Sequence, residues 1–146
     1  MSDTPAPSSP EPAARINASH VLALSLPLIL LGLCYGAYRL HQWIAVRDVF
    51  QQISQRTAVV KAEHTKNPNE GAAALDRRYG QALGTIDTSH TPRDFEQAFR
   101  TWAASWKVAA DLLDQNPNAG QMRKSIDAPT QAAADQLDAL RRKYEF

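Results

Sequence analysis

Residues 92–115, PRDFEQAFRTWAASWKVAADLLDQ, form the stretch that decides the fold. Large apolar side chains recur in it at alternating intervals of four and three residues, the spacing that places them on one face of a helix. Thr91 is a capping residue and Pro92 suits the first helical position. We therefore predict a helix over 92–115, and its apolar seam consists of Phe95, Phe99, Trp102, Trp106, Ala109 and Leu113.

This aromatic seam allows two interpretations. In the first, its side chains fill the core of a bundle of three or four helices. In the second, they line a groove for an apolar ligand or for a helix of a partner protein. The residues of such a groove would be Trp43, Phe95, Phe99, Trp102 and Trp106.

Helical patterns are present on both sides of this stretch. Residues 40–62 contain neither Gly nor Pro, and their apolar side chains follow a heptad spacing. Asn67-Pro68-Asn69 separates this segment from a second helix over 70–85, and Asp127 is the expected cap of the last helix. The predicted fold class is all-α, with two or three helices packed antiparallel on the first as a small bundle.

An uncharged run, VLALSLPLILLGLCYGAY, precedes this bundle at 21–38. Its length and apolar character predict a transmembrane helix over 18–41. Because no breaker follows it, we expect this single N-terminal transmembrane helix to continue into water as a stalk. Gly32 and Gly36 have the GxxxG spacing that permits close contact between membrane helices. A homodimer is compatible with this spacing but is not predicted.

The sequence thus predicts three segments: a disordered, Pro- and Ser-rich tail over 1–17, the transmembrane helix over 18–41 and a helical soluble domain over 42–146. An uncleaved anchor is favoured over a signal peptide, since Arg15 is the one basic residue before the run. The expected localisation is a single-pass protein of the bacterial inner membrane. Arg39, Arg47 and Arg56 favour a cytoplasmic domain, but folded domains behind one anchor are commonly exported. We favour the periplasm.

Composition and motifs exclude several functions. Lys and Arg number 16 against 15 Asp and Glu, so the chain lacks the excess of basic residues that nucleic-acid binding needs. Paired carboxylates, HExxH, a phosphate-binding glycine loop and CxxC are all missing from the sequence. The single cysteine, Cys34, lies in the apolar run. We therefore expect no catalytic residue, no metal site and no cofactor.

The function we expect is that of a membrane-anchored accessory or scaffold protein. It would contact the lipid bilayer and bind a protein partner in a membrane complex, without catalysis of its own. The alternative is a membrane-anchored ligand-binding or sensory module, in which the aromatic residues of 92–115 line a pocket.

Overall fold

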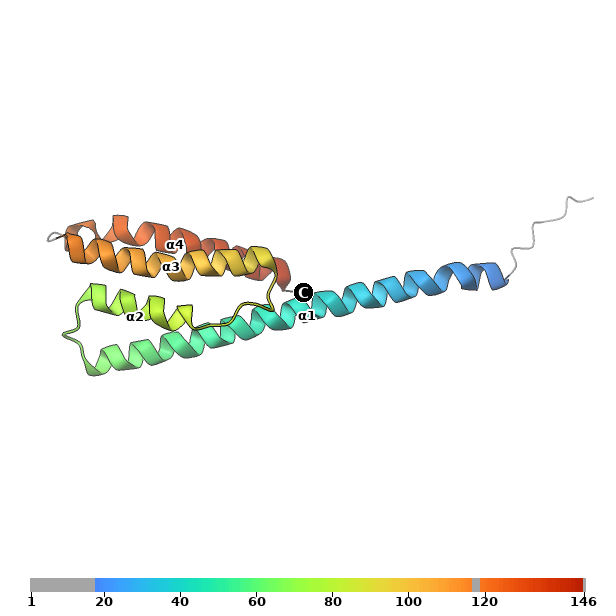
Figure 1. The fold of residues 1–146 in the computed structure, drawn as a ribbon, viewed down its shortest axis with the longest axis horizontal. Coiled ribbons are helices and arrows are strands. Elements are labelled where there is room, and N and C mark those ends of the chain that lie inside the picture. Colours follow the sequence, from blue (N-terminus) through green and yellow to red (C-terminus); the bar gives the residue numbers. More distant parts are fainter. Residues whose placement is uncertain (1–17, 117–118, 146) are drawn as a thin grey trace, which may run out of the picture. The chain divides into compact units, whose positions relative to one another are not determined.

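The computed structural model describes residues 18–116 and 119–145, with side chains over 25–116 and 123–145. In these ranges the chain is all-α and contains no strand, which confirms the all-α helical bundle of the predicted fold class but not its transmembrane helix (Figure 1). The helices are α1 (Ala18–Lys66), α2 (Ala72–Gly84), α3 (Arg93–Gln115) and α4 (Ala119–Tyr144). The disordered tail expected over 1–17 lies outside the described residues.

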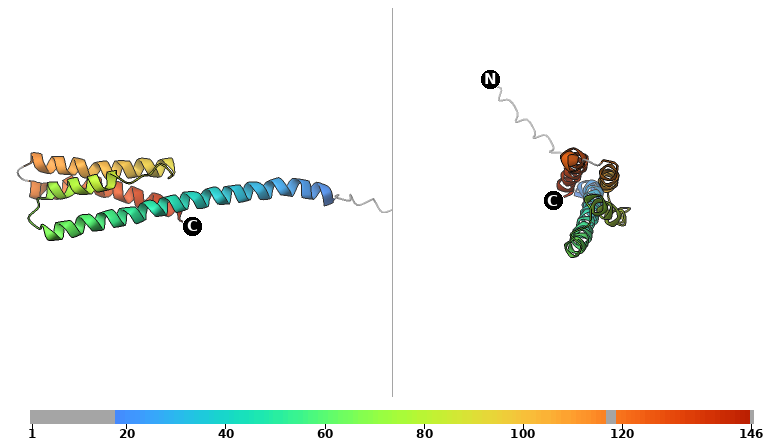
Figure 2. Two further views of the ribbon diagram at one scale, coloured as in Figure 1. Left: turned by 60° about the horizontal axis from the view of Figure 1, so that its bottom comes forward. Right: turned by 90° about the vertical axis from the view of Figure 1, so that its left-hand side faces the viewer.

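The chain divides into two compact units, 1–36 and 37–146, with the division inside α1. The second unit, which we call the bundle, contains residues 37–66 of α1 together with α2, α3 and α4. Helix α3 packs against both α2 and α4, and these neighbours remain adjacent in two further views (Figure 2). Gly80 lies where α2 meets α3, and a Cβ atom added there would lie 3.4 Å from the backbone nitrogen of Lys107, which is an ordinary van der Waals contact.

The apolar seam of α3 provides the centre of the bundle. Phe95 and Phe99 are 0% and 2% exposed, and the Phe95 ring meets Phe50 of α1 edge to face at a centroid distance of 5.8 Å. Trp102 and Trp106 pack against the same core but remain partly exposed. The predicted amphipathic pattern is therefore confirmed. The core residues are Val46, Val49, Leu83, Ile86, Phe95, Ala98, Phe99, Ala103, Leu137 and Tyr144.

Two predicted helix starts are wrong. Pro92 occupies the N-cap position of α3 without a side-chain cap, while the Thr91 hydroxyl donates to the carbonyl oxygen of Thr88 at 2.7 Å. Helix α4 begins at Ala119 and runs through Pro129, so Asp127 is an interior residue and not a cap. Ile126, in the turn before this proline, is buried, at 6% exposed.

The predicted transmembrane helix over 18–41 is also wrong for the part of the chain that the structure describes. No helix in that part is both long enough and apolar enough to cross a membrane. A span needs about 20 consecutive apolar residues. The uncharged run over 21–38 is 18 residues long and ends at the charged Arg39. This finding contradicts the single-pass, inner-membrane localisation, and the periplasmic placement depended on the same span.

The packing of Phe95 leads to a test of the fold. We expect Phe95→Ala to lower the free energy of unfolding by about 3–5 kcal/mol, because it leaves a cavity at a site with no solvent contact. Val108, 57% exposed on the same helix, is the matched control, and its replacement by Ala should change stability by less than ~0.5 kcal/mol. Urea denaturation followed by circular dichroism measures both. Equal losses would show that the α3 seam is not the core.

Candidate functional site

The five residues predicted to line a groove lie in three different environments. Phe95 and Phe99 are core residues. Trp102 and Trp106 lie at the edge of that core, with ring centroids 6.5 Å apart, and line a groove between α3 and α4. Trp43 of α1 lines a separate pocket near the end of α4. The structure therefore brings two of the three tryptophans together.

The α3–α4 groove has an aromatic side and a polar side. Its volume is about 340 Å³. The ring of Tyr79 from α2 lies against that of Trp106, at a centroid distance of 4.9 Å and an interplanar angle of 31°. Volumes of this order are typical of small-molecule sites that combine aromatic walls with a few polar groups. The groove is lined by Trp102, Trp106, Arg123, Asp127, Thr130, Gln131 and Ala134.

An ion pair next to this groove joins α4 to α2. Asp76 of α2 is 1% exposed, and Arg123 of α4 approaches both its carboxylate oxygens, Nη2 to Oδ1 at 3.2 Å and Nη1 to Oδ2 at 3.1 Å. Arg123 Nε also donates to Asp127 at 2.7 Å. Burial raises the pKa of Asp76, and the opposing effect of Arg123 only partly offsets it. The charged form of Asp76 is therefore stabilised by the guanidinium group of Arg123.

A second polar contact holds the end of α4 to the start of α3. Asp94 accepts hydrogen bonds at 2.7 Å from the Tyr144 hydroxyl and from Lys143 Nζ. Its Oδ1 also accepts from the backbone N–H of Phe95 at 2.9 Å. Partial burial alone would raise the pKa of Asp94, but these three donors outweigh it and hold the pKa below its ordinary value of 3.8.

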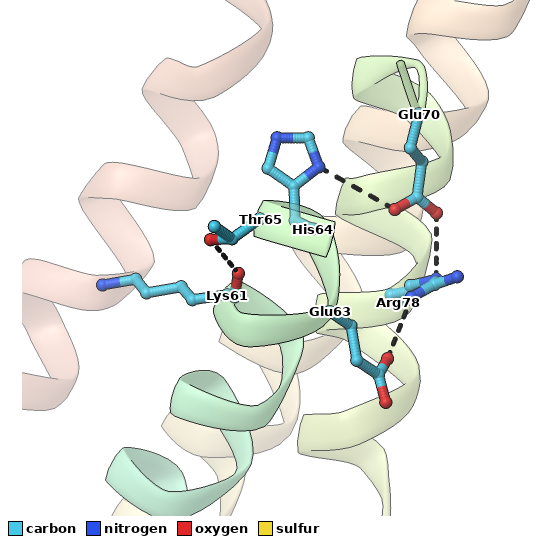
Figure 3. Close-up of polar contacts among 6 residues, drawn as sticks. All are labelled: Lys61, Glu63, His64, Thr65, Glu70 and Arg78. Atoms are coloured by element: carbon cyan, nitrogen blue, oxygen red, sulfur yellow. Dashed lines mark hydrogen bonds and ion pairs between the residues drawn. The ribbon is translucent and has the colours of Figure 1, made fainter. Parts of the chain in front are cut away.

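The connection between α1 and α2 carries a third polar network (Figure 3). Arg78 of α2 donates to Glu63 at 2.9 Å and lies 2.9 Å from a Glu70 oxygen. The other Glu70 oxygen faces His64 Nδ1 at 3.9 Å. Arg78 links the two carboxylates, whereas His64 Nδ1 and the Glu70 oxygen that faces it make no hydrogen bond. Contacts of this kind are typical of a structural turn. Among the described residues, no cluster of His, Cys, Asp and Glu is suited to hold a metal.

The pocket beside Trp43 is smaller, at about 180 Å³, and arginine side chains cover its aromatic rings. The guanidinium carbon of Arg47 lies 5.2 Å from the centroid of Trp43, and that of Arg141 lies 4.9 Å from the centroid of Phe50. The Arg141–Phe50 contact links α4 to α1, whereas Arg47 and Trp43 both lie on α1.

A different kind of surface is present in the first unit. Within 26–35 of α1, seven large apolar side chains are each more than half exposed, from 54% for Leu30 to 69% for Leu28. We call residues 26–35 the apolar segment. Around Gly32 and Gly36 an added Cβ atom would meet nothing within 4 Å, so the face that carries them is open. The exposed side chains are Leu26, Leu28, Ile29, Leu30, Leu31, Leu33 and Tyr35.

The sequence analysis did not predict the buried ion pair between Asp76 and Arg123, although the sequence contains an indication that Asp76 is buried. Asp76 stands three and seven residues before Tyr79 and Leu83, on the apolar stripe of its own helix. An acid on such a stripe indicates burial with a cationic partner. No local pattern identifies Arg123 as that partner, because it lies 47 residues away.

Comparison with family models, with curated proteins and with solved structures finds no match for this chain. Its function must therefore be argued from its own surfaces.

The Asp76–Arg123 pair gives a pH-dependent prediction. Arg123→Met should lower the free energy of unfolding by about 3 kcal/mol at neutral pH, because it leaves a buried carboxylate without its cation. The pKa of Asp76 is already raised in the folded state, so lowering the pH protonates Asp76 and relieves the penalty. Urea denaturation across a pH series measures this loss. The double variant Asp76→Leu/Arg123→Met should regain most of the stability at pH 7; a double variant as unstable as Arg123→Met would contradict this account.

Tyr144→Phe tests the contact between the ends of α3 and α4. Tyr144 is 7% exposed, and loss of its hydroxyl removes a hydrogen bond to a charged acceptor at a cost of about 1.5 kcal/mol. Since the folded pKa of Asp94 is lowered, this contribution is present above pH 3.8 and is lost as the pH falls through the folded value. Thermal unfolding in a pH series that descends from pH 7 measures the difference. A loss that stays the same size down to the acid end of the series would contradict the role of the Asp94 carboxylate as the acceptor.

Proposed function

We propose that this chain is a non-catalytic helical subunit that binds a protein partner through the apolar segment of α1. The observation that carries the proposal is the exposure of its seven large apolar side chains, none of them below 54%. Contiguous apolar surface of this kind marks interaction sites in native proteins. Scattered single residues, such as Val59 and Val108 in the bundle, need no such explanation.

The distribution of these side chains restricts the partner. At about 3.6 residues per turn, the seven positions are spread around the whole circumference of the helix. A shallow groove would cover only one side of such a helix. The partner should therefore supply apolar surface on several sides, as a group of helices from another protein does when it encloses a central one.

Charge also supports an apolar partner. No Asp, Glu, Lys or Arg occurs between Arg15 and Arg39, so the segment offers no group for an ion pair. Its binding energy would come from the removal of apolar surface from water. Salt should accordingly change the affinity little, in contrast to a surface that binds through charges.

Site-specific photocrosslinking in cells tests this proposal. A photoreactive phenylalanine at Leu31, which is 67% exposed, should give one discrete protein adduct, identified by mass spectrometry. The same group at Gln55, an exposed polar position of α1 in the bundle, should not give that adduct. No protein adduct at Leu31, or the same mixture at both positions, would contradict the proposal.

A charge substitution gives a second readout with a matched control. Leu28→Asp/Leu31→Asp should abolish the adduct formed through a photoreactive group at Leu33, because buried carboxylates without partners cost several kcal/mol. Val59→Asp replaces an isolated exposed side chain, 56% exposed, and should leave the adduct intact. The free energy of unfolding of the bundle should be unchanged in both variants. An adduct that survives the double substitution would contradict binding through the segment.

A further inference from the structure

We infer that the α3–α4 groove is a binding site for a small, uncharged aromatic molecule that carries a carbonyl acceptor, such as an aromatic amide. This site is independent of the apolar segment and of the function proposed for it. It is assigned by unpartnered polar atoms in the groove wall, by the aromatic rings beside them and by the balance of charge around them.

The first observation is that some buried side-chain polar atoms lack a hydrogen-bond partner. Among the described residues, six buried side-chain polar atoms lack a hydrogen-bond partner. Two of them, on His64 and Glu70, face each other at 3.9 Å, and two more belong to the Asp76–Arg123 ion pair. The remaining two are Trp106 Nε1 and Thr130 Oγ1, and both of these residues line the α3–α4 groove.

The Thr130 hydroxyl is unusual for a threonine in a helix. Such a hydroxyl normally returns to a carbonyl one turn earlier, and Thr57, Thr65 and Thr101 each donate to the carbonyl four residues before them. Thr130 is 8% exposed and has no partner among the described residues. Buried polar groups in native proteins are nearly always satisfied, so an exception calls for a ligand or a bound water.

The chemistry of these two atoms restricts the ligand. The indole N–H is a donor only, and a hydroxyl both donates and accepts. A molecule that satisfies both must carry an acceptor for the indole N–H, and an adjacent N–H would suit the hydroxyl oxygen. Both protein atoms are covered in the ligand-free groove, so binding includes a rotation of the Trp106 or Thr130 side chain toward the ligand.

The charges and hydrogen-bond donors of the groove favour an uncharged ligand. Arg123 is the cation of the groove, and two carboxylates, Asp76 and Asp127, already share it. An anion would therefore meet a net negative charge, and an ammonium cation, which has donors only, could not accept a hydrogen bond from the indole N–H. The rings of Trp102 and Trp106 provide flat apolar surface, on which an aromatic ring packs well.

Three probes of one shape and different charge test the inference: benzamide, benzoate and benzylammonium. Each is titrated into the full-length chain while the indole N–H signals are followed by nuclear magnetic resonance, with the Trp106 signal assigned through Trp106→Phe. Benzamide should shift this signal saturably, with a Kd on the order of 1 mM for so small a molecule. Binding of the two charged probes should be at least about tenfold weaker.

Thr130→Val removes the hydroxyl but retains the shape, and it should weaken benzamide binding at least about fivefold. Thr101→Val, on an exposed position of α3, is the matched control and should leave binding unchanged. The inference is overturned by no saturable shift with benzamide, by equal or tighter binding of a charged probe, or by unchanged binding to Thr130→Val.

The stability of Thr130→Val gives a second test, which does not depend on the affinity for benzamide. Because the Thr130 hydroxyl has no partner in the ligand-free chain, Thr130→Val should leave the urea midpoint of unfolding unchanged or raise it. A lower midpoint in the absence of ligand would show that the hydroxyl is already satisfied, and would overturn the site.

Discussion

Burial of the aromatic face of α3 is the interaction on which the rest of the bundle depends. Phe95 and Phe99 are enclosed by the other helices, and the edge-to-face contact with Phe50 ties residues 37–66 of α1 to the same core. The two cross-helix polar contacts lie at the margins of this core: Arg123 with Asp76 on one side, and Tyr144 with Asp94 on the other. These contacts fix the register of α4, while the removal of apolar surface from water supplies the driving force.

The apolar residues of the bundle and those of the apolar segment differ in their exposure to solvent. Those of the bundle are collected on helix faces and buried. Those of the apolar segment surround the helix and are exposed, although they are as large. The contrast between the buried Phe95 and the exposed side chains over 26–35 is the basis of our proposal that a partner covers this segment. The α3–α4 groove is a third case, in which polar atoms within an apolar wall lack their partners.

The spacing of apolar residues in the sequence predicted most helices of the bundle. It predicted few of the contacts that form the candidate sites. The four-and-three spacing of Phe95, Phe99, Trp102 and Trp106 identified the α3 seam, because amphipathic burial is a local property of one helix. The start of α4 was missed: we expected the last helix to begin at Asp127, whereas it begins at Ala119 and continues through Pro129. The Asp76–Arg123 pair and the separation of Trp43 from the other tryptophans depend on contacts between distant helices, which no single-helix pattern contains. The inference of a transmembrane helix relied on hydropathy alone and was contradicted.

Amide hydrogen exchange on the full-length chain tests the central claim most directly: the stability of the chain is held in the α3 seam, and the apolar segment is left available for a partner. Amides within 95–113 should exchange only through global unfolding, whereas those within 26–35 should open at a lower free energy and exchange at least about 100-fold faster. Equal protection of the two stretches would show that the apolar segment belongs to the cooperative core, and would contradict the account.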